Sequence, residues 1–136
     1  MGADHTSGNM VAMYLGKVLD PLKKEGQIEN SRENQIFCAA ADSMGLCLFA
    51  MYSIASPDAK EMFIKLVNAR LGTNWVADDF RRLGVRILKA EKDFNKKAGL
   101  TKKDDRLPEF FLKEPLPPHN VVFPFTEEEL DSAHDF

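Results

Sequence analysis

The chain has 136 residues, of which 44% are hydrophobic and 29% charged, with a formal net charge of −3 at pH 7. This length allows a single domain with a real core, and the small negative charge excludes the basic footprint that nucleic-acid binding needs. Because no apolar run reaches the length of a membrane span, we expect a cytoplasmic protein that contacts neither nucleic acid nor membrane.

Apolar residues at helical spacing predict a first amphipathic helix over about residues 8–19, namely Met10, Val11, Tyr14, Leu15 and Val18. An Asp-Pro pair at 20–21 interrupts it, and residues 26–30 are typical of a polar turn. A second, alanine-rich helix is predicted from an N-cap at Ser31 towards Met44. Gly45 is its natural stop, because glycine tolerates left-handed backbone geometry.

Residues 48–54 are apolar, and periodicity alone does not decide between helix and buried loop. The run 56–58, Ser-Pro-Asp, predicts the start of a third helix that ends at Gly72. Thr73 or Asn74 is then expected to cap the longest helix. That helix ends near Gly99 and carries an apolar stripe made of Val76, Phe80, Leu83, Ile87, Ala90 and Phe94.

From about residue 100 to 136 we expect an extended tail, because several prolines preclude a long helix: Pro108, Pro115, Pro117, Pro118 and Pro124. Lys102–Asp105 is expected to form a charged turn, and the tail to wrap over its own domain or a neighbour. Thr126 and Glu129 have capping-box spacing, which predicts a short helix. Because that helix is cut off within a few residues, we expect the natural chain to continue past Phe136.

No convincing strand pattern or internal repeat occurs, so the prediction is an all-α fold. We expect an irregular helical bundle with an extended proline-rich C-terminal segment, forming one domain over residues 1–136. Read without other information, Cys38 and Cys47 are most simply buried apolar residues, since they form neither a disulfide framework nor a compact zinc motif. His119 and His134 receive no predicted function.

Two segments carry a family resemblance. The first is the D-x-x-G-L-C run at 42–47. The second extends from Gly84 to Leu116 and contains the pattern G-x-T-[KR]-K-D-D-x-L-P-E followed by E-P-L. Together they resemble the C-terminal helical region of the tungsten-containing aldehyde ferredoxin oxidoreductases. The resemblance implies part of an enzyme that oxidises aldehydes to carboxylic acids at a tungsten (or molybdenum) bis-pterin and passes electrons through a [4Fe–4S] cluster to ferredoxin.

The resemblance also implies roles for four residues near the end of the second helix. Asp42 would accept hydrogen bonds from the pterin ring, and Gly45 would let the ligand approach the backbone. Leu46 would add an apolar or main-chain contact. Cys47 would be the fourth ligand of the cluster, the other three lying in a C-x-x-C-x-x-x-C run that this sequence does not contain.

The stretch from Gly2 to His5 resembles the family's loop that brings a histidine to the substrate, where its near-neutral pKa suits proton transfer. Many relatives continue with Leu-Arg, whereas this chain continues with Thr6 and Ser7, which leaves the substrate class open. Cys38 matches no position of the family and stays a structural residue.

The implied partners are the N-terminal part of the same enzyme, ferredoxin and an aldehyde. The isolated chain is expected to be inactive, to hold no cofactor, and to expose an apolar face that self-association would hide. The alternative is a stand-alone α-helical binding module, derived from the same family but without redox activity. In that case the proline-rich tail would be the surface that docks a partner.

Overall fold

The computed structural model describes residues 6–47, 49–50 and 56–136. Within these ranges the regular structure is helical, and the only strand-like pairing is an isolated antiparallel bridge between Leu116 and Val121. The all-α prediction is therefore confirmed. The elements are α1 (Val11–Leu15), α2 (Gln27–Ser43), α4 (Pro57–Leu71), α5 (Ala77–Lys97), the 3-10 helix η1 (Lys102–Asp105), α6 (Phe110–Lys113) and α7 (Glu127–Ser132).

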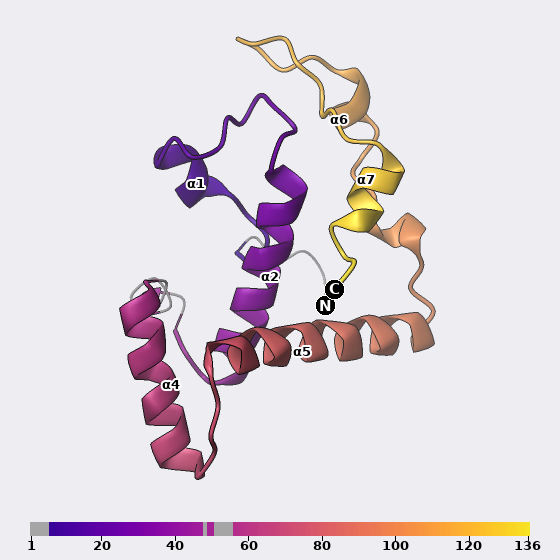
Figure 1. Cartoon of the computed structure of the whole chain (residues 1–136). Coiled ribbons are helices and arrows are strands. Elements are labelled where there is room, and N and C mark those ends of the chain that lie inside the picture. The colour runs from indigo at the N-terminus through magenta and orange to yellow at the C-terminus, as the bar shows by residue number, and fades with distance from the viewer. Residues whose placement is uncertain (1–5, 48, 51–55) are drawn as a thin grey trace.

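The helix α2 is central to the arrangement, and α5 crosses its C-terminal end (Figure 1). The helix α4 lies on one side of this crossing, and the tail with α6 and α7 lies towards the other end of α2. No helix in the described part of the chain is long and apolar enough to cross a membrane.

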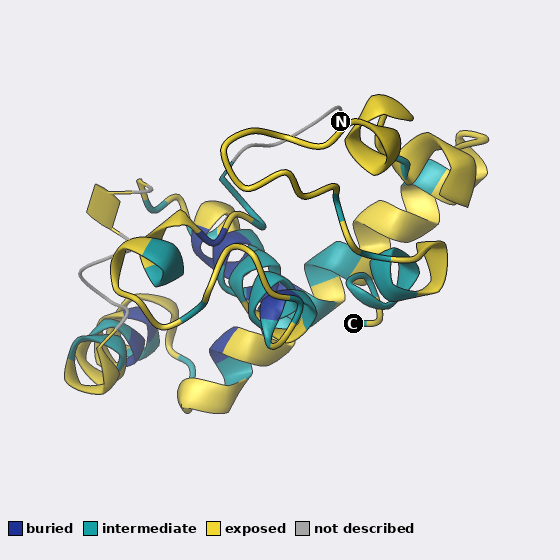
Figure 2. Cartoon of the chain, turned by 90° about the horizontal axis from the view of Figure 1, so that it is seen from above, coloured by how far each residue is buried: buried dark blue, intermediate teal, exposed yellow. Residues whose placement is uncertain are grey.

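The core forms where α2, α4 and α5 meet. Phe80 of α5 is only 1% exposed, and its ring contacts those of Phe37 on α2 and Phe63 on α4 at centroid distances of 5.8 and 6.0 Å. Ala40 and Ala41 are fully buried and let the helices approach closely. Buried residues gather around this meeting point, whereas the tail is mostly exposed (Figure 2).

Local signals placed α4 correctly. Ser56 is its N-cap, since the Ser56 hydroxyl accepts a hydrogen bond from the Ala59 N–H at 3.3 Å, and proline stands at the first helical position. The helix ends at Gly72, whose φ of +66° is the left-handed geometry expected for a glycine stop. Residues 48–54 fall largely outside the described residues, so the choice between helix and loop there stays open.

The expected N-cap of α5 was wrong. The helix begins at Ala77, where the Asp79 carboxylate accepts a hydrogen bond from the Val76 N–H at 2.8 Å. One of the two expected caps, Thr73, instead donates its hydroxyl hydrogen bond to the Asn68 side-chain oxygen at 2.8 Å. The same oxygen also accepts from the Trp75 N–H at 2.7 Å. These bonds build the α4–α5 connection and turn Trp75 towards the core.

Three predictions for the start of the chain also need correction. The first helix covers only Val11–Leu15, because the chain turns at Lys17, whose φ is +56°, and the Val18 N–H bonds back to the Met13 carbonyl at 2.9 Å. Residues 26–30 are not a polar turn, since α2 already begins at Gln27. Ser31 therefore lies inside α2 and is not its N-cap.

The apolar stripe of α5 is covered only where the helix crosses α2. Phe80 and Gly84 are buried and Leu83 is half-buried, but Val76 is 59% exposed and Phe94 is 72% exposed. The far half of α5 extends past the bundle and meets the tail instead. Helical periodicity thus identified the correct face of α5, but not how much of that face the rest of the chain covers.

The tail turns back onto α2 through α7. Thr126 and Glu129 form the expected capping box, and Lys24 binds the Glu129 carboxylate at 2.6 and 2.8 Å. Arg32 on α2 donates a hydrogen bond to the Ser132 carbonyl. This contact places α7 against the N-terminal half of α2, so the end of the tail lies on helices of its own chain.

Candidate cofactor-binding site

The D-x-x-G-L-C run forms the C-terminal cap of α2. Gly45 has a φ of +75°, its N–H donates to the Asp42 carbonyl at 2.9 Å, and the Leu46 N–H donates to the Ala41 carbonyl at 3.0 Å. This pair of bonds is a Schellman motif, which needs a residue in left-handed geometry and therefore favours glycine. The predicted helix stop at Gly45 is confirmed.

Leu46 anchors this cap to the core. Its half-buried side chain packs against the cluster of Cys38, Ala40, Ala41, Ile64 and Phe80. An apolar contact of this kind normally accompanies a Schellman motif. Two hydrogen bonds and one apolar contact thus hold the turn. The main chain on either side of Gly45 and Leu46 therefore has a fixed position.

Asp42 lies in the last turn of α2 and is exposed. A carboxylate is electrostatically unfavourable there, because the C-terminal end of a helix carries partial negative charge. The last turn holds no basic residue, and no hydrogen bond or ion pair joins the Asp42 carboxylate to another described residue. The acceptor capacity of Asp42 is therefore available to a ligand.

The two cysteines have opposite surroundings. Cys38 is 4% exposed and belongs to the core, which confirms the structural interpretation of that residue. Cys47 is exposed, directly after the capped turn. Only Cys47 can therefore present a thiolate to a metal without unfolding the core, so the expectation that it too is a buried apolar residue is wrong.

The residues present fit one side of a cofactor site. Among the described residues, no group of three or more His, Cys, Asp or Glu side chains could hold a metal ion. What the end of α2 offers is one acceptor, Asp42, and one thiol, Cys47, on the two sides of a rigid turn. One acceptor and one thiol could serve only a cofactor that takes its other ligands from elsewhere.

His5 lies outside the described residues, but the chain that follows it is held on α2. The Ser31 hydroxyl donates to the Gly8 carbonyl at 2.9 Å, and the Asn34 amide donates to the Ser7 carbonyl at 3.0 Å. Ser31 and Asn34 are thus candidate positioning residues for the N-terminal segment. This role could not be read from the sequence, which indicated Ser31 only as an N-cap and carried no signal for Asn34.

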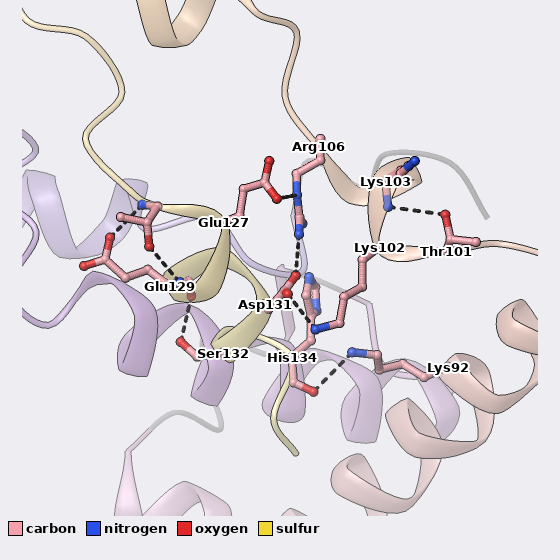
Figure 3. Close-up of polar contacts among 11 residues, drawn as sticks. Lys92, Thr101, Lys102, Lys103, Arg106, Glu127, Glu129, Asp131, Ser132 and His134 are labelled. Atoms are coloured by element: carbon pink, nitrogen blue, oxygen red, sulfur yellow. Dashed lines mark hydrogen bonds and ion pairs between the residues drawn. The ribbon is translucent and has the colours of Figure 1, made fainter.

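The charged residues at 102–105 form a turn, as expected. The Asp104 carboxylate accepts from the Thr101 N–H at 2.7 Å, and this bond holds the pKa of Asp104 below its ordinary value. Lys102 and Arg106 bind the two oxygens of Asp131 at 2.6 and 2.7 Å (Figure 3). These contacts fasten α7 and resemble no catalytic arrangement.

Lys92 of α5 contacts the main chain just after α7. Its ammonium donates a hydrogen bond to the His134 carbonyl at 3.3 Å (Figure 3). Burial lowers the pKa of the His134 imidazole, and the nearby Lys92 charge lowers it further. Both effects favour the neutral form of the His134 imidazole.

A shallow depression of about 320 Å³ lies at the start of α5 and is lined by Trp75, Asp79, Arg82, Leu83 and Arg86. None of the residues that the sequence singled out for a cofactor contributes to it. Arg82 is held by Asp78 and Asp79, and Arg86 adds a second guanidinium to the lining. The end of α2 remains the best candidate site.

A family model described as aldehyde ferredoxin oxidoreductase, domains 2 and 3, matches residues 1–133. The chain belongs to the aldehyde ferredoxin oxidoreductase family. This match confirms the resemblance drawn from residues 42–47 and 84–116. No solved structure matches the chain.

Curated relatives in this family are much longer than the chain. The tungsten-containing aldehyde ferredoxin oxidoreductase of Pyrococcus furiosus is 43% identical over 84 residues, which cover 61% of this chain and 13% of the relative. The proteins of the same name from Thermococcus kodakarensis and Pyrococcus horikoshii are 42% identical over 84 residues, with the same coverage. The chain thus aligns with only a small part of each relative.

Proposed function

We propose that this chain is the C-terminal helical part of an aldehyde ferredoxin oxidoreductase, either joined to the rest of the enzyme or as a separate subunit. The end of α2 then forms one wall of the pterin site and supplies one cluster ligand. When bound, the tungsten (or molybdenum) bis-pterin and the [4Fe–4S] cluster supply the oxidation of an aldehyde to a carboxylic acid and electron transfer to ferredoxin. The exposed pair Asp42 and Cys47, beside a rigid cap, carries this proposal.

Asp42 is proposed to hold the pterin. An ionised carboxylate only accepts hydrogen bonds and can take two parallel N–H donors from one planar ring. The Asp42 carboxylate is exposed and has no partner among the described residues, so no existing bond must break first. A donor at this position would also relieve the unfavourable interaction between the carboxylate and the end of α2.

Cys47 is proposed to bind one iron of the cluster. The Schellman turn fixes the main chain directly before Cys47, and fixed main chain reduces the conformational entropy lost on binding. The remaining three thiolates must come from the preceding part of the enzyme, since Cys38 is buried. His5 is proposed to face the substrate, as the family resemblance implies.

The test is Cys47→Ala in the enzyme assembled from this chain and the preceding part of the polypeptide. We expect loss of most cluster iron and sulfide, measured chemically and by visible absorption, and loss of ferredoxin reduction. Cys38→Ala is the matched control, because it removes the other thiol and costs only about 1–3 kcal/mol of packing energy. It should therefore retain the cluster.

The same comparison separates the two function classes. A Cys47→Ala enzyme with wild-type iron content would refute the proposed ligand and favour a stand-alone helical module without redox activity. Equal losses in both variants would show that the assembly is merely unstable. Only a loss confined to the Cys47 variant supports the proposed half-site.

A further inference from the structure

Residues 107–122, here called the apolar arm, form a long exposed apolar segment of the described chain. Leu, Val, Phe and Pro make up most of it, and every residue in the range is exposed. Leu116 is 72% exposed and Phe110 is 49% exposed. The arm, with α6 inside it, projects beyond the N-terminal end of α2, away from the helix crossing (Figure 1).

The arm has a defined shape of its own. The rings of Phe110 and Phe111 stack at a centroid distance of 4.2 Å, and the Phe123 N–H donates to the Phe111 carbonyl at 2.8 Å. At the tip, the Leu116 N–H donates to the Val121 carbonyl at 2.9 Å. Such an arm loses little conformational entropy when it docks, in contrast to an unstructured segment.

Both ends of the arm are fastened to the helices. Before it, Arg106 binds Asp131 of α7 at 2.7 Å, with side chains only 20% and 24% exposed. After it, the Lys24 ammonium lies 5.5 Å from the centre of the Phe125 ring and also binds Glu129. The apolar residues between these two points are therefore held out in a fixed position.

The arm also carries little charge that could repel an apolar surface. Glu109 and Lys113 form an ion pair with each other along α6. Glu114 and His119 are the other titratable side chains in the arm. An exposed, nearly neutral apolar segment of this size is unusual on a monomer and marks an interaction site.

We propose that the apolar arm docks on an apolar, uncharged surface of the preceding part of the same oxidoreductase. This inference rests on the proposed function. The curated relatives are much longer, since the aligned residues cover only 13% of them, so a large protein surface exists for the arm to meet. The arm and the Asp42–Cys47 site lie towards opposite ends of α2, a helix of 17 residues that is about 25 Å long. The chain would thus be held at two separate points.

The test measures binding of the chain to the preceding part of the polypeptide from the same source, produced as a separate protein. Leu116→Glu places a charge in the arm, and Leu15→Glu on α1 is the matched control because Leu15 is 80% exposed. We expect Leu116→Glu to weaken binding by at least about tenfold and the control to change it less than about twofold. Circular dichroism verifies that both variants fold.

The outcomes separate the arm from the proposed function. Tight binding of the wild-type chain with no effect of Leu116→Glu would overturn the arm inference alone. Absence of binding by the wild-type chain would overturn both. If Leu116→Glu abolishes only self-association, the arm binds a second copy and the proposed occupant is wrong. Protection of residues 107–122 from hydrogen exchange upon assembly supports the proposal, and unchanged exchange contradicts it.

Discussion

At the scale of single residues, Gly84 determines how closely α5 approaches α2. A Cβ atom at this position would lie 2.0 Å from the Ile36 carbonyl oxygen and 2.9 Å from a methyl carbon of the same residue. Gly45 is needed for a different reason, since a Cβ there would meet nothing within 4 Å but its φ is +75°. One glycine provides space between two helices, and the other provides backbone geometry.

We predict that Gly84→Ala destabilises the chain by about 1–3 kcal/mol, because the backbone of Ile36 must move to admit the methyl group. The sign of this change in the free energy of unfolding is informative. Alanine is the better helix former by about 1 kcal/mol and would otherwise stabilise α5. Urea unfolding followed by far-UV circular dichroism measures the change. Ala90→Gly, on an exposed position of the same helix, reports the propensity effect by itself. A more stable Gly84→Ala chain would refute the close contact.

At the scale of elements, α7 depends on its neighbours. A helix of six residues is marginal alone, and its last carbonyls have no partner within the helix. Here Arg32 and Gln35 of α2 donate to the Ser132 and Ala133 carbonyls, and Lys92 of α5 donates to the His134 carbonyl. Cations at this end also interact favourably with the helix dipole. The end of α7 thus links α2 to α5.

We predict that acid releases α7 through Asp131. Hydrogen bonds from Lys102 and then Arg106 lower the pKa of Asp131 below its ordinary value. A carboxyl with a lowered folded pKa contributes stability above its unfolded pKa and loses it as pH falls through the folded pKa. The hydrogen-exchange protection of residues 127–132, corrected for the intrinsic exchange rate at each pH, should therefore fall as the pH falls below about 4.

Asp131→Asn should show faster exchange already at neutral pH and a smaller change on acidification. Asp135→Asn, an exposed neighbour, serves as the control and should follow the wild-type profile. The comparison is needed because the pKa values of Glu129 and Asp104 are also lowered and these groups titrate in the same range. Identical profiles for all three proteins would exclude a role for Asp131.

Helix ends could be predicted where the signal is local to the terminus. The Ser56 side chain caps the start of α4, and the left-handed backbone of Gly72 ends the helix. The start of α5 could not be predicted, for two reasons. Thr73 donates its hydroxyl hydrogen bond to Asn68 in the previous helix, and the helix is capped instead by Asp79, which lies inside α5. A capping residue competes with tertiary partners, and these are not visible in a linear pattern.

The candidate site could be predicted only in part. A glycine stop and an exposed acid follow from helix chemistry, but the link between Asp42 and a ligand came from the family pattern at 42–47. The spacing of the cysteines alone predicted that both are buried, whereas the fold buries Cys38 and leaves Cys47 exposed. That difference arises from which face of α2 meets α5 and from the turn at Gly45.

At the scale of the whole molecule, the buried core is small relative to the apolar surface that stays exposed. The core is confined to the meeting point of α2, α4 and α5, while Phe49, Leu15 and Phe94 are 81%, 80% and 72% exposed. Single exposed hydrophobic residues are common, but several large ones together with the apolar arm favour a chain that works against a further protein surface.

We predict that the chain alone cannot hold an iron–sulfur cluster. A [4Fe–4S] cluster needs four thiolates, and the chain has two cysteines, one of them buried in the core. Anaerobic reconstitution with iron and sulfide, followed by desalting, should leave far less than one cluster per chain and no aldehyde oxidation. A stable, stoichiometric cluster on the isolated chain would contradict the proposed half-site.

The position of Trp75 gives the molecule a built-in optical reporter. It is the chain's single tryptophan, its main chain is held by Asn68, and its indole packs on the same cluster that Leu46 touches. Its fluorescence therefore reports on the core around the end of α2 without any added label. Because iron–sulfur clusters absorb broadly in the near ultraviolet and visible range, a cluster bound beside Cys47 would quench this emission. Assembly of the proposed site could then be followed in real time from a single emission band.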